Sequence, residues 1–287
     1  MAVSYSHKWG QIIGDVLEFA IRQFLQKIAS EHNLYLDYKK SRKARPGKKV
    51  SWQDKYGNSH DLDYVIERGG TENTLGLPVA FIEIAWRRYT KHSRNKAQEI
   101  EGAIVPLSQT YNHLHPFLGI ILAGEFTSGS LSQLKSKGFT VLYLDYASII
   151  KAFNAAGIVA SFNEDTPENE FKKKIKKWKT FGTKDIQKIV IKLLNIKAGG
   201  INTFRQELIR SIARKVTSIT VLALHGCAVK LNTIQNAIEY INEYKDKEPC
   251  ENPVLKYEID IKYSNGDNIH AIFQNKKESV IFLKSFM

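Results

Sequence analysis

The sequence has few cysteines and no long apolar run. Its 287 residues include two cysteines, Cys227 and Cys250, too few for a disulfide framework or a zinc cluster. The longest apolar runs, "FLGIILAGEF" and "ITVLALHG", are too short to span a bilayer. The first residues lack the apolar stretch and cleavage site of a secretory signal. We therefore expect a cytoplasmic protein with no membrane partner.

Three common catalytic motifs are also absent. The sequence contains no G-x-x-x-x-G-K, no G-x-S-x-G and no H-E-x-x-H. These motifs respectively cradle nucleotide phosphates, expose a nucleophilic serine and bind zinc from one helix face. Their absence argues against an energy-driven motor, a serine hydrolase and a zinc protease.

Positive charge, by contrast, is in excess. Lysine and arginine number 42 against 29 acidic residues, which gives a net charge of +13. The charge is also clustered, because residues 172–197 carry ten lysines and one acid, Asp185. Lysine and arginine favour polyanions, since their phosphate contacts release condensed counterions. We therefore expect a nucleic acid as the partner.

The first half of the chain alternates helical and strand patterns. Apolar residues at helical spacing predict a long helix over 7–33, and a basic loop with proline and glycine follows it. The order then continues with strands at 49–54, 60–67 and 79–86, a helix at 90–111, a strand at 117–124, a helix at 128–138, a strand at 139–146 and a helix at 147–157. This order predicts an α/β fold with a mixed central sheet flanked by helices.

The second half begins after a polar segment that contains Pro167, which we take as a domain boundary. The patterns predict helices at 168–180, 183–196 and 201–214, a strand at 216–226, a helix at 233–246, a hairpin over 255–273 and a last helix at 276–286. We expect two domains. Residues 1–163 would carry the chemistry, and residues 168–287 would form a basic α+β region for DNA binding or dimerisation.

Acidic residues on two neighbouring predicted strands form the candidate site. In "HDLDYVIE", Asp61 and Asp63 are two apart and share a strand face, and Glu83 does so with Ala85 and Arg87 in "AFIEIAWRR". An acid on each of two paired strands can approach to about 5 Å. Two carboxylates at that distance repel unless a cation lies between them, and Mg²⁺ prefers such oxygen ligands. The pattern therefore predicts a Mg²⁺ site.

This arrangement resembles the PD-(D/E)XK nuclease superfamily, over roughly residues 5–153. In that family an aspartate at the head of one strand pairs with Glu-x-Lys on the next. The resemblance puts Asp63 and Glu83 at the family's metal-binding positions, and Asp61 is a second ligand or a competing assignment. It implies a restriction-endonuclease-like core and a Mg²⁺-dependent endonuclease in which Mn²⁺ can substitute.

The sequence departs from the family at Ala85, where the resemblance places a lysine. That lysine orients the attacking water and offsets negative charge in the transition state. Three explanations stay open. Arg87, Lys91 or Lys96 takes over the role, with Lys91 our first candidate; or the alanine is an engineered replacement of lysine; or the domain is a degenerate nuclease that only binds DNA.

Two predicted helices add further candidates. Gly10, Gly14 and Glu18 lie at i, i+4 and i+8, so small residues would let this helix approach the sheet while Glu18 reaches the metal site. The alternative is that Glu18 is an exposed surface acid. In the helix after residue 90, Gln98 lies on one face with Lys91, and the family often uses polar side chains from this helix. That face could equally be a solvated basic surface.

The resemblance implies that the partner is double-stranded DNA. By analogy with the family, a nuclease of this size with an attached α+β region looks like a bacterial type II restriction endonuclease, and these act as homodimers that cut both strands. Two alternatives remain. One is a structure-specific nuclease that acts on junctions or in repair, and the other is an inactive nuclease fold that only binds DNA.

Overall fold

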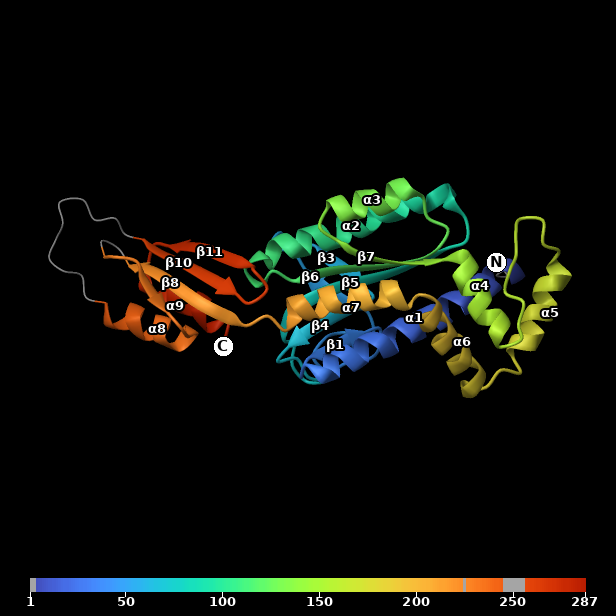
Figure 1. Ribbon diagram of the computed structural model, residues 1–287, viewed down its shortest axis with the longest axis horizontal. Helices are drawn as coiled ribbons and strands as arrows, with labels where there is room; N and C mark the ends of the chain where they lie inside the picture. Colours follow the sequence, from blue (N-terminus) through green and yellow to red (C-terminus); the bar gives the residue numbers. More distant parts are fainter. Residues whose placement is uncertain (1–3, 224–225, 245–255) are drawn as a thin grey trace. The chain divides into compact units, whose positions relative to one another are not determined.

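The computed structural model describes residues 4–223, 226–244 and 256–287 (Figure 1). The chain forms two compact units that divide between Ile212 and Ala213. This division differs from the predicted boundary near Pro167. Pro167 is instead the residue that precedes a helix, and apolar residues after it, such as Phe171 and Phe204, belong to the core of the first unit.

The first unit contains a five-stranded mixed sheet, which confirms the expected α/β class with a mixed sheet flanked by helices. The strand order is β1-β4-β5-β6-β7; the first three strands are antiparallel, and β5, β6 and β7 are parallel. These strands are β1 (Tyr35–Tyr38), β4 (Tyr64–Arg68), β5 (Leu77–Arg87), β6 (Phe117–Gly124) and β7 (Thr140–Asp145).

Helices cover both faces of this sheet (Figure 1). One face packs against α1, α4 and α7, with α6 packed on α1 and α4, and the other face packs against α2 and α3. The helices of the first unit are α1 (Tyr5–Glu31), α2 (Ser93–Thr110), α3 (Ser128–Ser136), α4 (Tyr146–Ala155), α5 (Glu168–Trp178), α6 (Thr183–Ile196) and α7 (Ala198–Ile212), with short 3-10 turns at Thr90–His92 and Asn112–Leu114. Because strand side chains alternate, Ile82 faces α1 while Phe81 and Ala85 face α2.

The antiparallel part of the sheet differs from the prediction. The predicted strand over 60–67 is two strands, β3 (Ser59–Leu62) and β4, with a break at Asp63. β3 pairs with β2 (Val50–Gln53), the strand predicted at 49–54, in a separate hairpin. The strand that pairs with β4 in the main sheet is instead β1. The rule that residues two apart share a face therefore does not apply to Asp61 and Asp63.

A buried ionic network ties β1 and β4 to the basic loop between β1 and β2. Its four side chains are Asp37, Arg42, Arg45 and Glu67, and none of them is more than 4% exposed. Arg42 contacts Glu67 at 2.6 Å and Asp37 at 2.9 Å, and Arg45 contacts Asp37 at 2.8 Å. Arg42 also donates to the carbonyl oxygens of residues 71 and 74. The network thus fixes two loops beside the sheet.

The second unit repeats one motif, a hairpin followed by a helix. Its elements are β8 (Val216–Ala223), β9 (Val229–Leu231), α8 (Ile234–Glu243), β10 (Tyr257–Tyr263), β11 (Asn268–Phe273) and α9 (Lys276–Lys284). The sheet is antiparallel with the order β11-β10-β8-β9, and both helices pack into its core. Thr233 and Asn275 cap the two helices in the same way, each accepting a hydrogen bond from a backbone N–H three residues on.

Composition bears on two further features, the cysteines and possible membrane-spanning helices. Cys227 is an exposed free thiol, and Cys250 lies outside the described residues. Among the helices of residues 4–223, 226–244 and 256–287, none is long and apolar enough to cross a membrane.

Replacing Arg42 tests the buried network. Arg42→Ala leaves two carboxylates buried beside each other with one partner removed, and we expect a loss of about 3–5 kcal/mol in the free energy of unfolding. The matched control is Lys49→Ala, which removes an ion pair with Asp61 whose side chains are 72% and 49% exposed, and here we expect a loss under about 1 kcal/mol. Urea unfolding measures both, and similar losses would contradict the assignment.

Candidate active site

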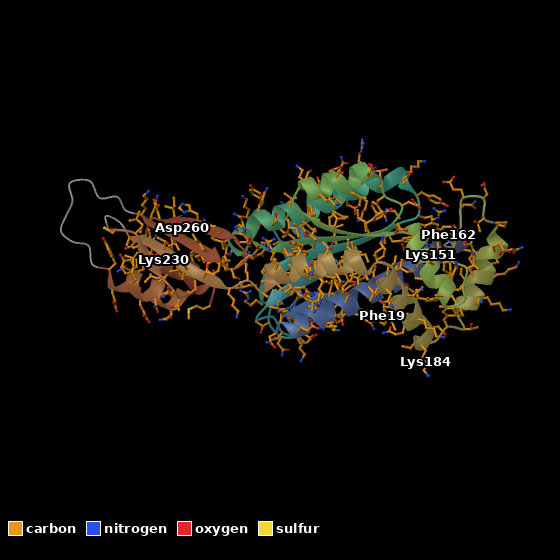
Figure 2. All side chains as sticks on the ribbon, viewed as in Figure 1. Phe19, Lys151, Phe162, Lys184, Lys230 and Asp260 are labelled. Carbon is orange, nitrogen blue, oxygen red and sulfur yellow. The ribbon has the colours of Figure 1, made fainter. Side chains whose placement is uncertain are left out.

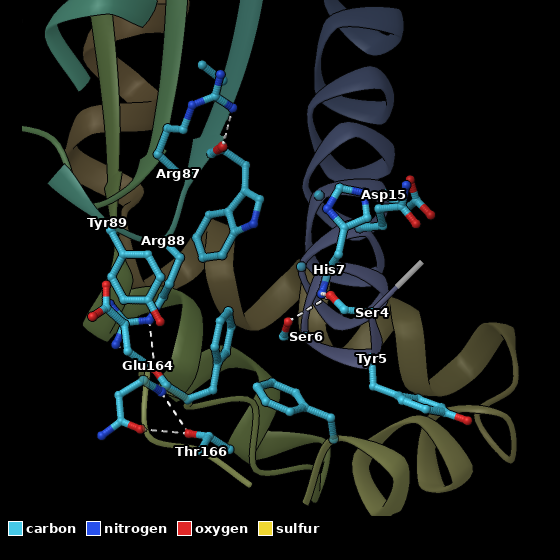
Figure 3. A pocket seen from close by; sticks show the side chains of 18 of the residues that line it. Ser4, Tyr5, Ser6, His7, Asp15, Arg87, Arg88, Tyr89, Glu164 and Thr166 are labelled. Carbon is cyan, nitrogen blue, oxygen red and sulfur yellow. Dashed lines mark hydrogen bonds between the residues drawn. The ribbon is translucent and has the colours of Figure 1, made fainter. Parts of the chain in front are cut away.

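A cleft of about 1090 Å³ opens at the carboxyl end of β5. Its walls come from the first half of α1, from the end of β5 and the residues after it, and from the segment between α4 and α5 (Figure 3). Six of the candidate site residues line it or lie at its floor: Glu18, Asp63, Glu83, Ala85, Arg87 and Lys96. The structure therefore brings acids from three separate chain segments into one cavity.

Backbone hydrogen bonds hold the carboxyl groups of Asp63 and Glu83 together. Tyr64 pairs with Ile82 in the antiparallel register of β4 and β5, so Asp63 lies opposite Glu83. The backbone N–H of Asp63 donates to Glu83 Oε1 at 3.0 Å, and the N–H of Ile84 donates to Asp63 Oδ2 at 2.9 Å. These reciprocal bonds fix both carboxyl groups side by side at the cleft floor.

Burial, reinforced by this contact, makes Glu83 a weak acid. Its side chain is largely buried, with the whole residue only 8% exposed. The pKa of Glu83 is raised from an ordinary 4.5 to about 9, mainly by burial and then by the charge and the side chain of Asp63, while the backbone N–H of Asp63 and the charge of Lys96 oppose the shift. At neutral pH Glu83 accordingly retains its proton, and a cation bound between the two groups would displace it.

Glu18 lies on the cleft side of α1, as the glycine spacing suggested. A Cβ atom added to Gly10 or Gly14 would lie 3.9 or 3.8 Å from the indole of Trp86, so this helix face packs directly on the ring at the end of β5. The pKa of Glu18 is raised, first by partial burial and then by the charges of Asp63 and Asp15. A third acidic group is thus electrostatically linked to the pair.

Ala85, at the position where the resemblance placed a lysine, is buried in the apolar core. Ala85 is 3% exposed and belongs to the apolar cluster between the sheet and α2. Lys96, from the first turn of α2, lines the cleft with a side chain 17% exposed, and its charge lowers the pKa of Glu83. Lys91 and Gln98 are exposed and do not line the cleft. Of the two candidate lysines, Lys96 is therefore the one that lies in the cleft with Asp63 and Glu83.

Asp61 is separated from the acidic pair. It lies on β3, is about half exposed, and is hydrogen-bonded to Lys49 and Ser51. The cleft lining does not include it. Because the chain breaks at Asp63, the two aspartates that looked equivalent in sequence face different surroundings, and the structure gives Asp61 no contact with Glu83.

The donor set suits a weakly coordinated hard cation. Within the described part of the chain, no group of three or more histidine, cysteine, aspartate or glutamate side chains is arranged to hold a metal ion. Mg²⁺, however, is commonly held by one or two carboxylates, with water and substrate phosphate completing its shell. The pair of Asp63 and Glu83, two neighbouring carboxyl groups of which Glu83 has a raised pKa, fits that kind of site.

The residues at the end of the cleft beyond β5 were not predicted from the sequence. Arg88 donates two hydrogen bonds to the carbonyl oxygen of Phe162 and lies 3.9 Å from the centroid of the Tyr146 ring, which stacks on Trp86. The run "WRRY" at residues 86–89 was the available signal, because it combines aromatic rings with arginines directly after the acidic strand. Its partners come from distant segments.

Glu83→Gln tests the proton on Glu83 through stability. The folded-state pKa of Glu83 lies above its unfolded value, so the free energy of unfolding falls as pH rises from about 4.5 towards 9. The glutamine side chain of the variant does not titrate and can still donate to Asp63. Without divalent cations, we expect the variant to be more stable than the wild type by roughly 1–3 kcal/mol at pH 8, with the difference shrinking towards pH 5.

Urea unfolding across pH 5–9 measures this effect. Glu170→Gln is the matched control, because Glu170 is an exposed carboxylate on α5 that pairs with Lys173. We expect that this change does not raise the free energy of unfolding at any pH in this range. A Glu83→Gln variant that is less stable than the wild type at pH 8 would contradict the protonated pair.

Comparison with known proteins identifies no family. No family model matches the sequence, and no curated protein matches it. Among solved structures, the crystal structure of a protein of unknown function, AF1548, is similar over 63% of this chain and 99% of its own, with 10% sequence identity and a TM-score of 0.28. A likeness this weak carries no argument about fold or function.

Proposed function

We propose that this protein is a Mg²⁺-dependent endonuclease that hydrolyses phosphodiester bonds in DNA, of the PD-(D/E)XK kind. The observation that carries the proposal is the pair of carboxyl groups of Asp63, which is half-buried, and Glu83, which is buried, held side by side at the floor of a cleft. The order α1, β1, β4, β5, α2, β6 supports it, because that family's core has a helix, three strands, a helix and a strand.

In this proposal Asp63 and Glu83 hold the cation. A bound Mg²⁺ lowers the pKa of a coordinated water and offsets charge on the scissile phosphate. Lys96 lies where its ammonium group can stabilise negative charge that develops on the phosphate, which Ala85 cannot do. Glu18, with its raised pKa, lies at the same site and can hold a proton or a hydrogen-bonded water.

The distribution of lysines supports a nucleic-acid substrate. Helices α5 and α6 expose a series of lysine side chains, Lys184 among them (Figure 2). Charges of this kind bind phosphates without reading sequence. Double-stranded DNA and a homodimer that cuts both strands, as in a type II restriction enzyme, remain our proposals for substrate and assembly. A protein that binds DNA without cutting is the second candidate, and the buried Ala85 favours it.

Plasmid nicking in Mg²⁺ and in Mn²⁺ tests the proposal. We expect Asp63→Asn and Glu83→Gln to lower the nicking rate at least about 100-fold, because each removes a ligand of the cation, and Lys96→Ala to lower it by a similar factor. Lys91→Ala and Asp61→Asn are matched controls with the same charge changes outside the cleft, and they should retain activity.

The same assay separates the two candidate functions. A wild-type chain that binds DNA tightly but cuts no plasmid, linear duplex or branched DNA in either metal would be the binding protein. Cutting that is confined to branched DNA would identify a junction or repair nuclease. Nicking that survives Glu83→Gln would overturn the assignment of this site.

A further inference from the structure

The cleft changes character along its length. One part holds Glu18, Asp63 and Glu83, whereas the part beyond the end of β5 is lined by aromatic rings together with Glu164 and Glu168. Figure 3 shows this second part, with Tyr89 and Arg88 on the strand side and Tyr5 at the first turn of α1. Trp86, Phe162 and Phe171 belong to the apolar packing of the first unit, so the rings free to meet a ligand are those that are exposed.

Two of these rings are exposed, which is unusual in this chain. Among the described residues, three aromatic side chains have more than a third of their surface open to solvent: Tyr5 at 39%, Tyr56 at 74% and Tyr89 at 36%. Tyr5 and Tyr89 line the cleft, and Tyr56 does not. Two of the three exposed aromatic residues in the described part of the chain therefore line this cavity.

Each of the two exposed rings has a cation beside it. The ammonium group of Lys172, which also pairs with Glu168 at 3.2 Å, lies 4.9 Å from the centroid of the Tyr5 ring, and the guanidinium carbon of Arg88 lies 4.8 Å from that of the Tyr89 ring. Arg88 is fixed by its bonds to Phe162. A ring face next to a cation offers a stacking surface for a base and a charge for the adjoining phosphate.

We propose that this end of the cleft binds unpaired nucleobases, so that the duplex substrate proposed above carries a single-stranded segment beside the phosphate that is cut. The inference rests on the function proposed above. Bases inside a continuous duplex stack on each other and do not expose their faces, so they cannot use these rings. The stretch of chain from Glu83 to Tyr89 spans at most about 20 Å, a length that a few nucleotides of single strand can follow.

Binding without cleavage tests this inference. In the Glu83→Gln background and without divalent cations, fluorescence anisotropy would compare a labelled blunt duplex with the same duplex carrying a single-stranded thymidine tail. We expect tighter binding of the tailed duplex. Tyr5→Ala together with Tyr89→Ala should weaken tailed binding at least about fivefold, since stacking contributes roughly 1–3 kcal/mol per base, and should leave blunt binding unchanged.

Two further variants control for structure. Tyr89→Phe keeps the ring and should keep the preference for the tail. Tyr56→Ala removes an exposed ring that also has a lysine neighbour, at 5.1 Å, but lies outside the cleft, and it should change neither affinity. Equal affinity for the blunt and tailed duplexes, or no greater loss in the double variant than in Tyr56→Ala, would overturn the inference.

The binding experiment on this end of the cleft and the cleavage assay of the proposed function can fail independently of each other. If the wild type cuts nothing but prefers the tail through its tyrosines, the nuclease proposal fails and the binding site stands. If it cuts blunt duplexes and the tyrosines have no effect, the nuclease proposal stands and the single-strand site fails.

Discussion

The site depends on the reciprocal contact between Asp63 and Glu83. Each carboxyl group accepts a hydrogen bond from the backbone at or next to the other residue, so the geometry of β4 and β5 holds two like charges together. Such a contact is unfavourable when both groups are ionised, and the protein meets it by retaining a proton on Glu83. A divalent cation would remove the same repulsion. The contact thus links the pairing of two strands to the chemistry of the cleft.

The surroundings of the pair follow from its position in the sheet. β5 has β4 on one side and β6 on the other and is covered by helices on both faces, so the Glu83 carboxyl group is sheltered from water except at the cleft. Gly10 and Gly14 let α1 pack on Trp86, which closes one wall and carries Glu18 to the pair. The buried network around Arg42 fixes β1 beside β4. Packing therefore sets the electrostatics of the site.

Long apolar or amphipathic segments were predictable from sequence, and local breaks were not. The strand at 117–124 and the helix at 183–196 have the predicted bounds, because their patterns are continuous. β1 was missed because it has four residues and a buried acid, Asp37, whose partners Arg42 and Arg45 follow in a loop. The juxtaposition of Asp63 and Glu83 was predictable from their strands. The separation of Asp61 was not, because it depends on the hairpin of β2 and β3. Lys91 was the first candidate for the role of the missing lysine, but it lies in the 3-10 turn before α2, which begins at Ser93, and Lys96 lies in the cleft instead.

The number of protons released on Mg²⁺ binding tests the account most directly. Isothermal titration calorimetry at pH 7.5, in buffers with different ionisation enthalpies, gives both the affinity and that number. If Glu83 holds the proton that the cation displaces, binding to the wild type releases about one proton per ion, and Glu83→Gln abolishes both binding and release. Mg²⁺ binding that releases no proton and persists in Glu83→Gln would contradict the account, because the cation would then lie elsewhere.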